Sequence, residues 1–143
     1  MQYIAVFIIL VFSLEFSFAA STDDELAAAI THYESIIFSS VADRVSYEIE
    51  NAKLTEQQAA DWIGSITNSL AVCDLEALTI LGNDVRAESI GALADGAGKE
   101  AIHYAVEKKM DADPNFKAVV LEYSKARRRC IEKINQEFGI DYY

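Results

Sequence analysis

The sequence is short of the two residues that most often interrupt helices. Of its 143 residues, only one is proline and six are glycine. The proline, Pro114, follows Asp113, and this pair is typical of a helix start because aspartate caps the first turn and proline fits its first position. No stretch shows the strict alternation of apolar and polar residues that marks a strand. These absences predict an all-α protein.

Basic residues are also scarce, with 12 Lys and Arg against 23 Asp and Glu and a formal net charge of −11. An acidic surface repels nucleic-acid phosphates and anionic lipid headgroups, so we expect neither nucleic acid nor a membrane surface as a partner. The imbalance is uneven. Residues 20–100 hold fifteen acidic residues against four basic ones, whereas residues 101–143 hold seven against eight. The C-terminal part is therefore the electrostatic complement of the rest.

Long apolar runs are confined to the first 20 residues, which carry a single charged side chain. Ser17 and Ala19 match the small-x-small pattern of a cleavage site, so we expect residues 1–19 to be a cleaved secretory signal peptide. A cut one residue later and a retained anchor are alternatives, although the apolar run is shorter than the roughly 20 residues that span a bilayer. Cleavage would leave residues 20–143 as a single helical domain that is secreted or periplasmic.

Cysteine is nearly absent, since Cys73 and Cys130 are the only two. Exported proteins meet oxidising conditions, and two cysteines in such a chain usually form a disulfide. The bond would close a loop of about 58 residues and stabilise the fold by roughly 4 kcal/mol, because it removes entropy from the unfolded chain. Two buried free thiols in a reducing compartment are the alternative.

Helical periodicity and capping signals divide the chain into four to five helices. Ser39 and Ser40 could host a bend in the first helix, and Thr55 with Gln58 forms a capping box for the second. Short connections favour a compact bundle in which neighbouring helices are mostly antiparallel. The expected helices run from Ser21 or Thr22 to about Asn51, from Thr55 to Gly82, from Val85 to about Ala94, from Lys99 to about Met110, and from Asp113 to Gly139.

The apolar stripes of the second and last helices each carry one cysteine. Cys73 lies in register with Ile66 and Leu70, and Cys130 lies in register with Tyr123 and Ile134. Both cysteines should therefore face the core, and we predict an interhelical disulfide between these two helices.

Half of the glycines lie close together, at positions 91, 96 and 98. Glycine is unfavourable inside a helix by about 1 kcal/mol relative to alanine, so the cluster indicates a break near residues 95–98. Small residues that allow close helix approach, or that leave room for a ligand, are the alternative interpretation.

The segment that starts at Asp111 shares part of the spacing of a calcium-binding EF-hand loop. Asp111, Asp113, Asn115 and Glu122 fall at positions 1, 3, 5 and 12 of that loop. Phe116 occupies the sixth position, where the loop requires glycine for its sharp turn. We therefore interpret this segment as an ordinary helix start without a metal ion.

Signatures of catalysis are missing. Glu100 and His103 form a single E-x-x-H pair, whereas a di-iron helical site needs a second such pair and two further glutamates. The sequence contains no G-x-S-x-G, phosphate-binding loop or H-E-x-x-H motif. We predict no enzymatic activity, no metal site and no cofactor.

The most distinctive polar feature is a basic ridge, Lys125, Arg129 and Lys133, which stack at four-residue spacing on the last helix. Like charges at this spacing destabilise a helix, so the ridge needs acidic partners. These could come from the same helix, from the acidic first helix or from another protein. Arg127 differs because it lies on the apolar stripe, and we expect it to reach the surface or to pair with a carboxylate at the edge of the core.

These features favour a small exported binding protein. Our first hypothesis is a non-catalytic module that engages another exported protein through the basic ridge, as an inhibitor or immunity protein would. The alternative is a carrier of a small hydrophobic ligand in the bundle interior, suggested by a chain that is 52% hydrophobic and by the glycine cluster.

Overall fold

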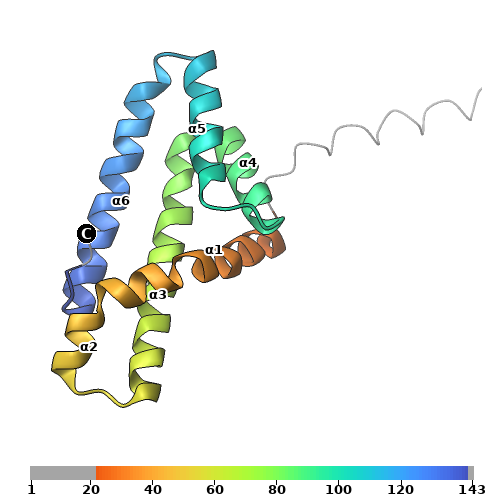
Figure 1. Ribbon diagram of the computed structural model, residues 1–143. Coiled ribbons are helices and arrows are strands. Elements are labelled where there is room, and N and C mark those ends of the chain that lie inside the picture. The colour runs from red at the N-terminus through yellow and green to blue at the C-terminus, as the bar shows by residue number, and fades with distance from the viewer. Residues whose placement is uncertain (1–21, 142–143) are drawn as a thin grey trace, which may run out of the picture.

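The computed structural model describes residues 22–141, which form six α-helices and one short 3₁₀ helix (Figure 1). No strand occurs in this range, which confirms the all-α class. None of these helices is long and apolar enough to cross a membrane. The predicted signal peptide, residues 1–19, lies outside the described residues. The elements are α1 (Asp23–Arg44), α2 (Ser46–Ala52), α3 (Glu56–Ala77), η1 (Leu78–Leu81), α4 (Asn83–Ala94), α5 (Glu100–Ala112) and α6 (Phe116–Phe138).

Several predicted helix ends are confirmed by their capping contacts. The Thr22 hydroxyl accepts a hydrogen bond from the Glu25 amide at 3.2 Å, which starts α1. Thr55 and Gln58 form the expected capping box, with each side chain accepting from the backbone amide of the other. Gly139 ends α6 in the left-handed conformation, at φ +65°.

The prediction of one long first helix to about Asn51 is wrong, because the chain kinks at Val45 and divides into α1 and α2. Val45 has φ −100° and ψ 8°, outside helical values, and its side chain is fully buried. The Ser46 hydroxyl donates to the Asp43 carbonyl at 2.9 Å, which is a local side-chain contact that competes with helix continuation. The bend therefore lies at Val45 and not at the serine pair 39–40.

Two further boundaries also differ from expectation. The last turn of the second helix tightens into η1 before Gly82, whose φ of +91° ends it where predicted. The last helix begins at Phe116, three residues after the expected start at Asp113, and the Asp113 carboxylate accepts from the Asn115 amide at 3.0 Å in the preceding turn. Because of the kink at Val45, the described residues form six α-helices, whereas four or five were expected.

The helices are arranged around α3. Figure 1 shows α1 lying across α3, whereas α5 and α6 run as an antiparallel hairpin. Helix α1 packs against α3 and α4, α3 packs against α6, and α5 contacts both α4 and α6. Antiparallel packing is thus clear in this hairpin, while α1 crosses its neighbour.

The core consists of two hydrophobic clusters that meet along α3. The first contains Leu75, Leu78, Ile90 and Leu93, all of them almost completely buried. The second surrounds the disulfide at the other end of the molecule. Its buried members are Val41, Val45, Ile66, Leu70, Cys73, Ile134 and Ile140. The predicted bond between Cys73 of α3 and Cys130 of α6 is confirmed, with the two Cα atoms 6.1 Å apart.

Candidate ligand-binding site

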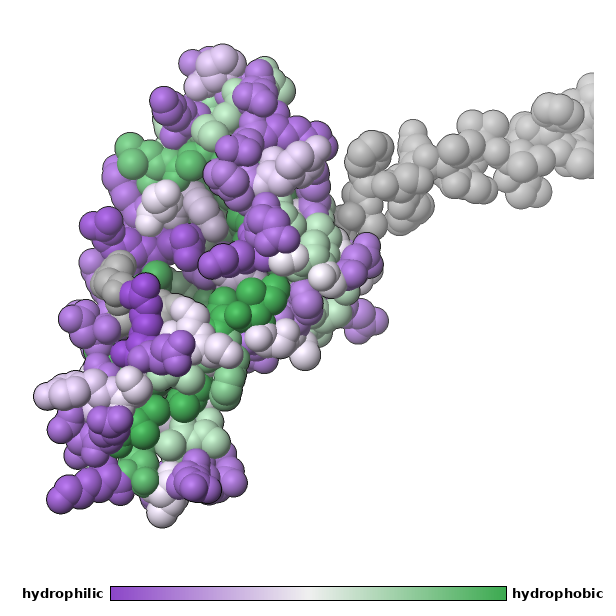
Figure 2. Space-filling model, in the orientation of Figure 1, coloured by the Kyte–Doolittle hydropathy of each residue, from purple (hydrophilic) through white to green (hydrophobic). Residues whose placement is uncertain are grey.

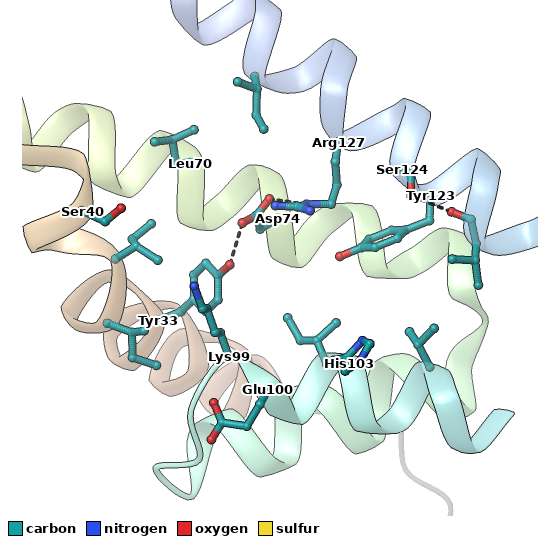
Figure 3. Close-up of a pocket in the computed structure, with 16 residues that line it drawn as sticks. Tyr33, Ser40, Leu70, Asp74, Lys99, Glu100, His103, Tyr123, Ser124 and Arg127 are labelled. Atoms are coloured by element: carbon teal, nitrogen blue, oxygen red, sulfur yellow. Dashed lines mark hydrogen bonds and ion pairs between the residues drawn. The ribbon is translucent and has the colours of Figure 1, made fainter. Parts of the chain in front are cut away.

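A pocket of about 560 Å³ opens between α1, α3, α5 and α6. Its polar side chains come from all four of these elements and from the residue that precedes α5, and Figure 3 shows them around the cavity. Most of the remaining wall is aliphatic. The aliphatic lining residues are Ile36, Ile37, Leu70, Ile102, Val106, Val120 and Ile131.

Asp74 is the centre of the polar wall and joins three helices. The Tyr33 hydroxyl of α1 donates to Asp74 Oδ2 at 2.6 Å, and Arg127 Nε of α6 donates to Asp74 Oδ1 at 2.7 Å. Figure 3 shows both side chains pointing toward the carboxylate. We call these three residues the Asp74 cluster. Because its two oxygens accept from two different helices, the Asp74 carboxylate links α1, α3 and α6.

The members of the Asp74 cluster differ in how far they are buried, and burial shifts their pKa values. The Asp74 side chain is 10% exposed and that of Arg127 is 38% exposed, so Arg127 is the more accessible member of the pair. Burial, together with the charge and the hydrogen bond of Asp74, raises the pKa of Tyr33 far above its ordinary value. Burial alone would lower the pKa of Arg127, but the hydrogen bond and charge of Asp74 raise it overall.

Tyr123 extends the cluster along α6. The Arg127 guanidinium carbon lies 5.8 Å from the centre of the Tyr123 ring, within the range of a cation–π contact. Burial raises the pKa of the Tyr123 hydroxyl, and the Arg127 charge opposes this effect only in part. The ring therefore packs in the core while its hydroxyl points toward the pocket in Figure 3.

The start of α5 forms the rim opposite the Asp74 cluster. Lys99 and Glu100 line the pocket there, together with His103, whose side chain is 73% exposed and lies 2.9 Å from Glu107. His32 of α1 donates to the Ala97 carbonyl oxygen at 3.0 Å, which holds the turn before α5 against α1. The position of this rim thus depends on a contact between α1 and the α4–α5 connection.

Two exposed ion pairs fix α5 to α4. Lys108 lies 3.1 Å from Glu88, and Lys109 lies 2.5 Å from Asp84. The hydrogen bond from Lys109 lowers the pKa of the Asp84 carboxyl and raises that of Lys109 itself. Helix α5 is therefore attached to α4 by exposed polar contacts as well as by packing.

The surface around this region is mixed in character. Figure 2 shows apolar side chains at the surface where α1 crosses α3, bordered by hydrophilic side chains on the surrounding helices. An apolar interior with a polar border is the usual composition of a site for a small molecule.

The basic ridge lies on the exposed side of α6. Lys125 pairs with Glu122 of the same helix at 2.8 Å, and this hydrogen bond lowers the pKa of the Glu122 carboxyl. Arg129 and Lys133 are exposed and form no ion pair with any residue between 22 and 141. Of the alternatives for the ridge, pairing within the same helix therefore occurs at Lys125, and pairing with the acidic first helix does not occur in the described part of the chain.

The structure separates the residues that the sequence offered as metal ligands. Glu122 is engaged with Lys125, while Asp113 caps the turn before α6. His103 contacts Glu107 in place of Glu100. Within residues 22–141, no group of three or more His, Cys, Asp or Glu side chains is arranged to hold a metal ion.

The glycine cluster does not form the pocket. Gly91 lies within α4, and Gly96 and Gly98 lie in the connection to α5, where Gly96 has φ +94°. None of the three lines the cavity. The predicted break near residues 95–98 is confirmed, whereas the room for a ligand lies elsewhere, between α1, α3, α5 and α6.

Asp74 is the residue that sequence reasoning did not identify. The prediction for Arg127 is confirmed, since it pairs with a carboxylate at the edge of the core, but its partner was not named. A signal was present in the sequence. Asp74 is the only charged residue between Asp61 and Glu76, and it lies four residues from both Leu70 and Leu78 on the buried face.

Comparison with known proteins adds no assignment. The chain matches no protein-family model, no curated protein and no solved structure.

Proposed function

We propose that this protein is a non-catalytic binding protein whose pocket holds a small amphipathic molecule. The observation that carries the proposal is the pocket itself, which combines seven aliphatic lining residues with polar and charged side chains that include the partly buried Asp74 cluster. An aliphatic wall favours the apolar body of a ligand, while a few fixed polar groups orient it. Among our two hypotheses from the sequence, this arrangement favours the ligand carrier.

The size of the pocket supports a small molecule as its occupant. Its volume of about 560 Å³ lies within the roughly 300–1,000 Å³ of typical ligand sites. The polar groups are fixed before any ligand enters, because the Asp74 cluster holds three helices in place. Such preorganisation reduces the entropy that binding must overcome.

We also propose that the mature protein works outside the cytoplasm, in the extracellular space or the periplasm. The disulfide between Cys73 and Cys130 supports this, because disulfides persist in oxidising compartments. The signal peptide expected at residues 1–19 agrees with the same location. Alkylation of mature, non-reduced protein should leave both cysteines unlabelled, and labelling of both would contradict the proposal.

The function can be tested by filling the pocket. Ser124 lines the cavity, is exposed, and donates its hydroxyl to the Val120 carbonyl within its own helix. A Ser124→Trp substitution should place an indole in the opening without disturbing the core. We expect the affinity for a neutral, environment-sensitive dye such as Nile red to fall about tenfold or more, measured by fluorescence titration.

A matched control is available on α3. Ser65 is also exposed and donates to the carbonyl of Asp61 in the same manner, but it lies away from the pocket. Ser65→Trp should therefore bind the dye as the wild type does. Equal binding by wild type and both variants would contradict a ligand site in this pocket, and so would native mass spectra and titrations in which the wild type binds no small molecule.

We propose a second function for the basic ridge, as a docking face for an acidic exported protein. The observation that favours it is that Arg129 and Lys133 are exposed on α6 and have no ion-pair partner among the described residues. Unpaired charges of one sign on an acidic body can steer a complementary partner and fix its orientation. This proposal is independent of the pocket.

The ridge can be tested by charge reversal. A variant with Lys125→Glu, Arg129→Glu and Lys133→Glu should lose any exported protein that co-purifies with the wild type. Reversal of Lys53, which is exposed in the connection between α2 and α3, should leave co-purification intact. Co-purification that survives reversal of the ridge would contradict this docking face.

A further inference from the structure

On the charged side of the pocket, the side chain of the cation Arg127 is more exposed than that of the anion Asp74. Both oxygens of Asp74 accept hydrogen bonds, from Tyr33 and from Arg127, and its side chain is only 10% exposed. Arg127 is 38% exposed and uses Nε for Asp74, whereas a guanidinium carries further N–H donors on its two amino groups. Arg127 is therefore the more accessible of the two partners, and its guanidinium has donors that the contact with Asp74 does not use.

The opposite rim adds a second cation. Lys99 lines the pocket, is exposed, and forms no ion pair with another described residue. In Figure 3 its side chain rises toward the space in front of Tyr33, whereas the Glu100 carboxylate is directed away from that space. Arg127 and Lys99 thus border the pocket on two sides with positive charge.

The apolar wall restricts what the rest of the ligand can be. Ile37 of α1, Ile102 of α5 and Ile131 of α6 line the cavity from three helices. A flexible aliphatic chain packs well against such side chains, whereas a strongly polar body would lose its hydration without new hydrogen bonds. The pocket therefore fits one charged group attached to an apolar chain.

We propose that the ligand is an anionic amphiphile, a long-chain carboxylate whose head pairs with Arg127, while the positive charge of Lys99 on the opposite rim adds to the attraction. This inference rests on the proposed ligand-binding function and specifies the chemistry of its ligand. Arginine suits the role because its planar donors match a carboxylate, and it is more weakly hydrated than an ammonium group. Asp74 and Tyr123 act as positioning residues, since they orient Arg127 through a hydrogen bond and a cation–π contact.

The test compares three ligands that share one chain and differ only in the head. Dodecanoate, dodecanol and dodecylammonium are titrated into the wild-type protein at pH 7 and below micelle-forming concentrations, by displacement of Nile red. We expect dodecanoate to bind about tenfold or more tightly than dodecanol, which is the effect of one charge-assisted hydrogen bond, and dodecylammonium to bind most weakly. High salt should weaken the binding of dodecanoate and leave the binding of dodecanol unchanged.

Variants assign the effect to named residues. Lys99→Gln should weaken dodecanoate several-fold without affecting dodecanol, while Lys117→Gln, which removes an exposed charge away from the pocket, should change neither. Because loss of Arg127 alone would leave Asp74 unpaired, we use the double variant Asp74→Asn/Arg127→Gln, which keeps hydrogen-bonding side chains at both positions. This variant should lose most of the preference for dodecanoate over dodecanol and keep only the several-fold part that Lys99 supplies.

The outcomes distinguish the proposed ligand-binding function from the proposed anionic nature of the ligand. If dodecanol or dodecylammonium binds as tightly as dodecanoate, the proposal of an anionic head group is wrong, while the proposed ligand-binding function stands. If none of the three binds, both proposals fail. Preference for dodecanoate that persists in Asp74→Asn/Arg127→Gln and in Lys99→Gln would overturn the assignment of the head to these residues.

Discussion

Two cations that lie two residues apart on α6 form ion pairs in different environments, one between two helices and partly buried, the other within one helix and exposed. Arg127 reaches across to Asp74 of α3, 53 positions away in sequence, at a distance of 2.7 Å. Lys125 pairs at 2.8 Å with Glu122, three positions away on the same helix. The distances are nearly equal, but the Asp74 side chain is 10% exposed and that of Glu122 is 58% exposed.

This difference determines what each pair contributes to the fold. Water and salt screen an exposed pair, so its contribution is small and often not measurable. A buried carboxylate that loses its partner is left uncompensated in a low-dielectric environment, which is strongly destabilising. The contact between distant helices should therefore matter for stability, while the contact within one helix should not.

The largest expected effect comes from Asp74→Ala. The substitution leaves Tyr33 and Arg127 without their shared acceptor, and we expect the free energy of unfolding to fall by about 2–3 kcal/mol, less than for a fully buried pair because Arg127 is partly solvated. Urea denaturation followed by circular dichroism measures the change. Asp61→Ala removes an exposed acid from the same helix and should cost much less. Equal losses in the two variants would show that burial does not distinguish these carboxylates.

A smaller and pH-dependent effect is expected for Tyr33→Phe. At pH 7 the loss of the hydrogen bond to Asp74 should cost about 1–2 kcal/mol. The pKa of Tyr33 is raised far above its ordinary value of 10.0, so the folded protein keeps a proton that the unfolded chain releases. The stability from this group is complete below pH 10 and declines as the pH rises above it, by about 1.4 kcal/mol per pH unit.

Unfolding curves between pH 8 and pH 11.5 test this prediction. The wild type should lose stability above pH 10 more steeply than Tyr33→Phe, which still carries the buried Tyr123 hydroxyl and Lys109, whose pKa values are raised in the same direction. Tyr47→Phe is the control because Tyr47 is 73% exposed, and it should follow the wild type. A wild type and Tyr33→Phe with parallel alkaline profiles would contradict the role of Tyr33.

The smallest effect is expected for Glu122→Gln. Because both members of its pair with Lys125 are exposed, neutralising Glu122 should leave the thermal midpoint unchanged at physiological salt. A slight decrease could emerge only at low ionic strength, where screening is weak. A loss as large as that of Tyr33→Phe at physiological salt would remove the distinction between the two cations of α6.

The sequence predicted helix ends better than helix interiors, and the physical reason is locality. Thr55 with Gln58 and the glycines at 82 and 139 act on residues three or four positions away, so their effect can be read from neighbours alone. The kink at Val45 depends on burial of that side chain against α3 and α6 in the second core cluster. A contact of this kind is visible only once the helices are packed.

The candidate site follows the same rule. The periodicity of α6 placed Arg127 on the core side, where it would either reach the surface or pair with a carboxylate. Nothing local to α6 could select Asp74 from the acidic residues of the chain. The pairing of the two cysteines was the one long-range contact that composition alone could supply, because only one connectivity exists. Since Asp74 follows Cys73 directly, the disulfide could have drawn attention to it.

The adjacency of Cys73 and Asp74 also has a mechanical consequence. These neighbours on α3 hold Cys130 and Arg127, which lie about one turn apart on α6. A shift of α6 along α3 by one turn, about 5.4 Å, would have to break a covalent bond and a buried ion pair together. Helices α3 and α6 therefore behave as a rigid frame.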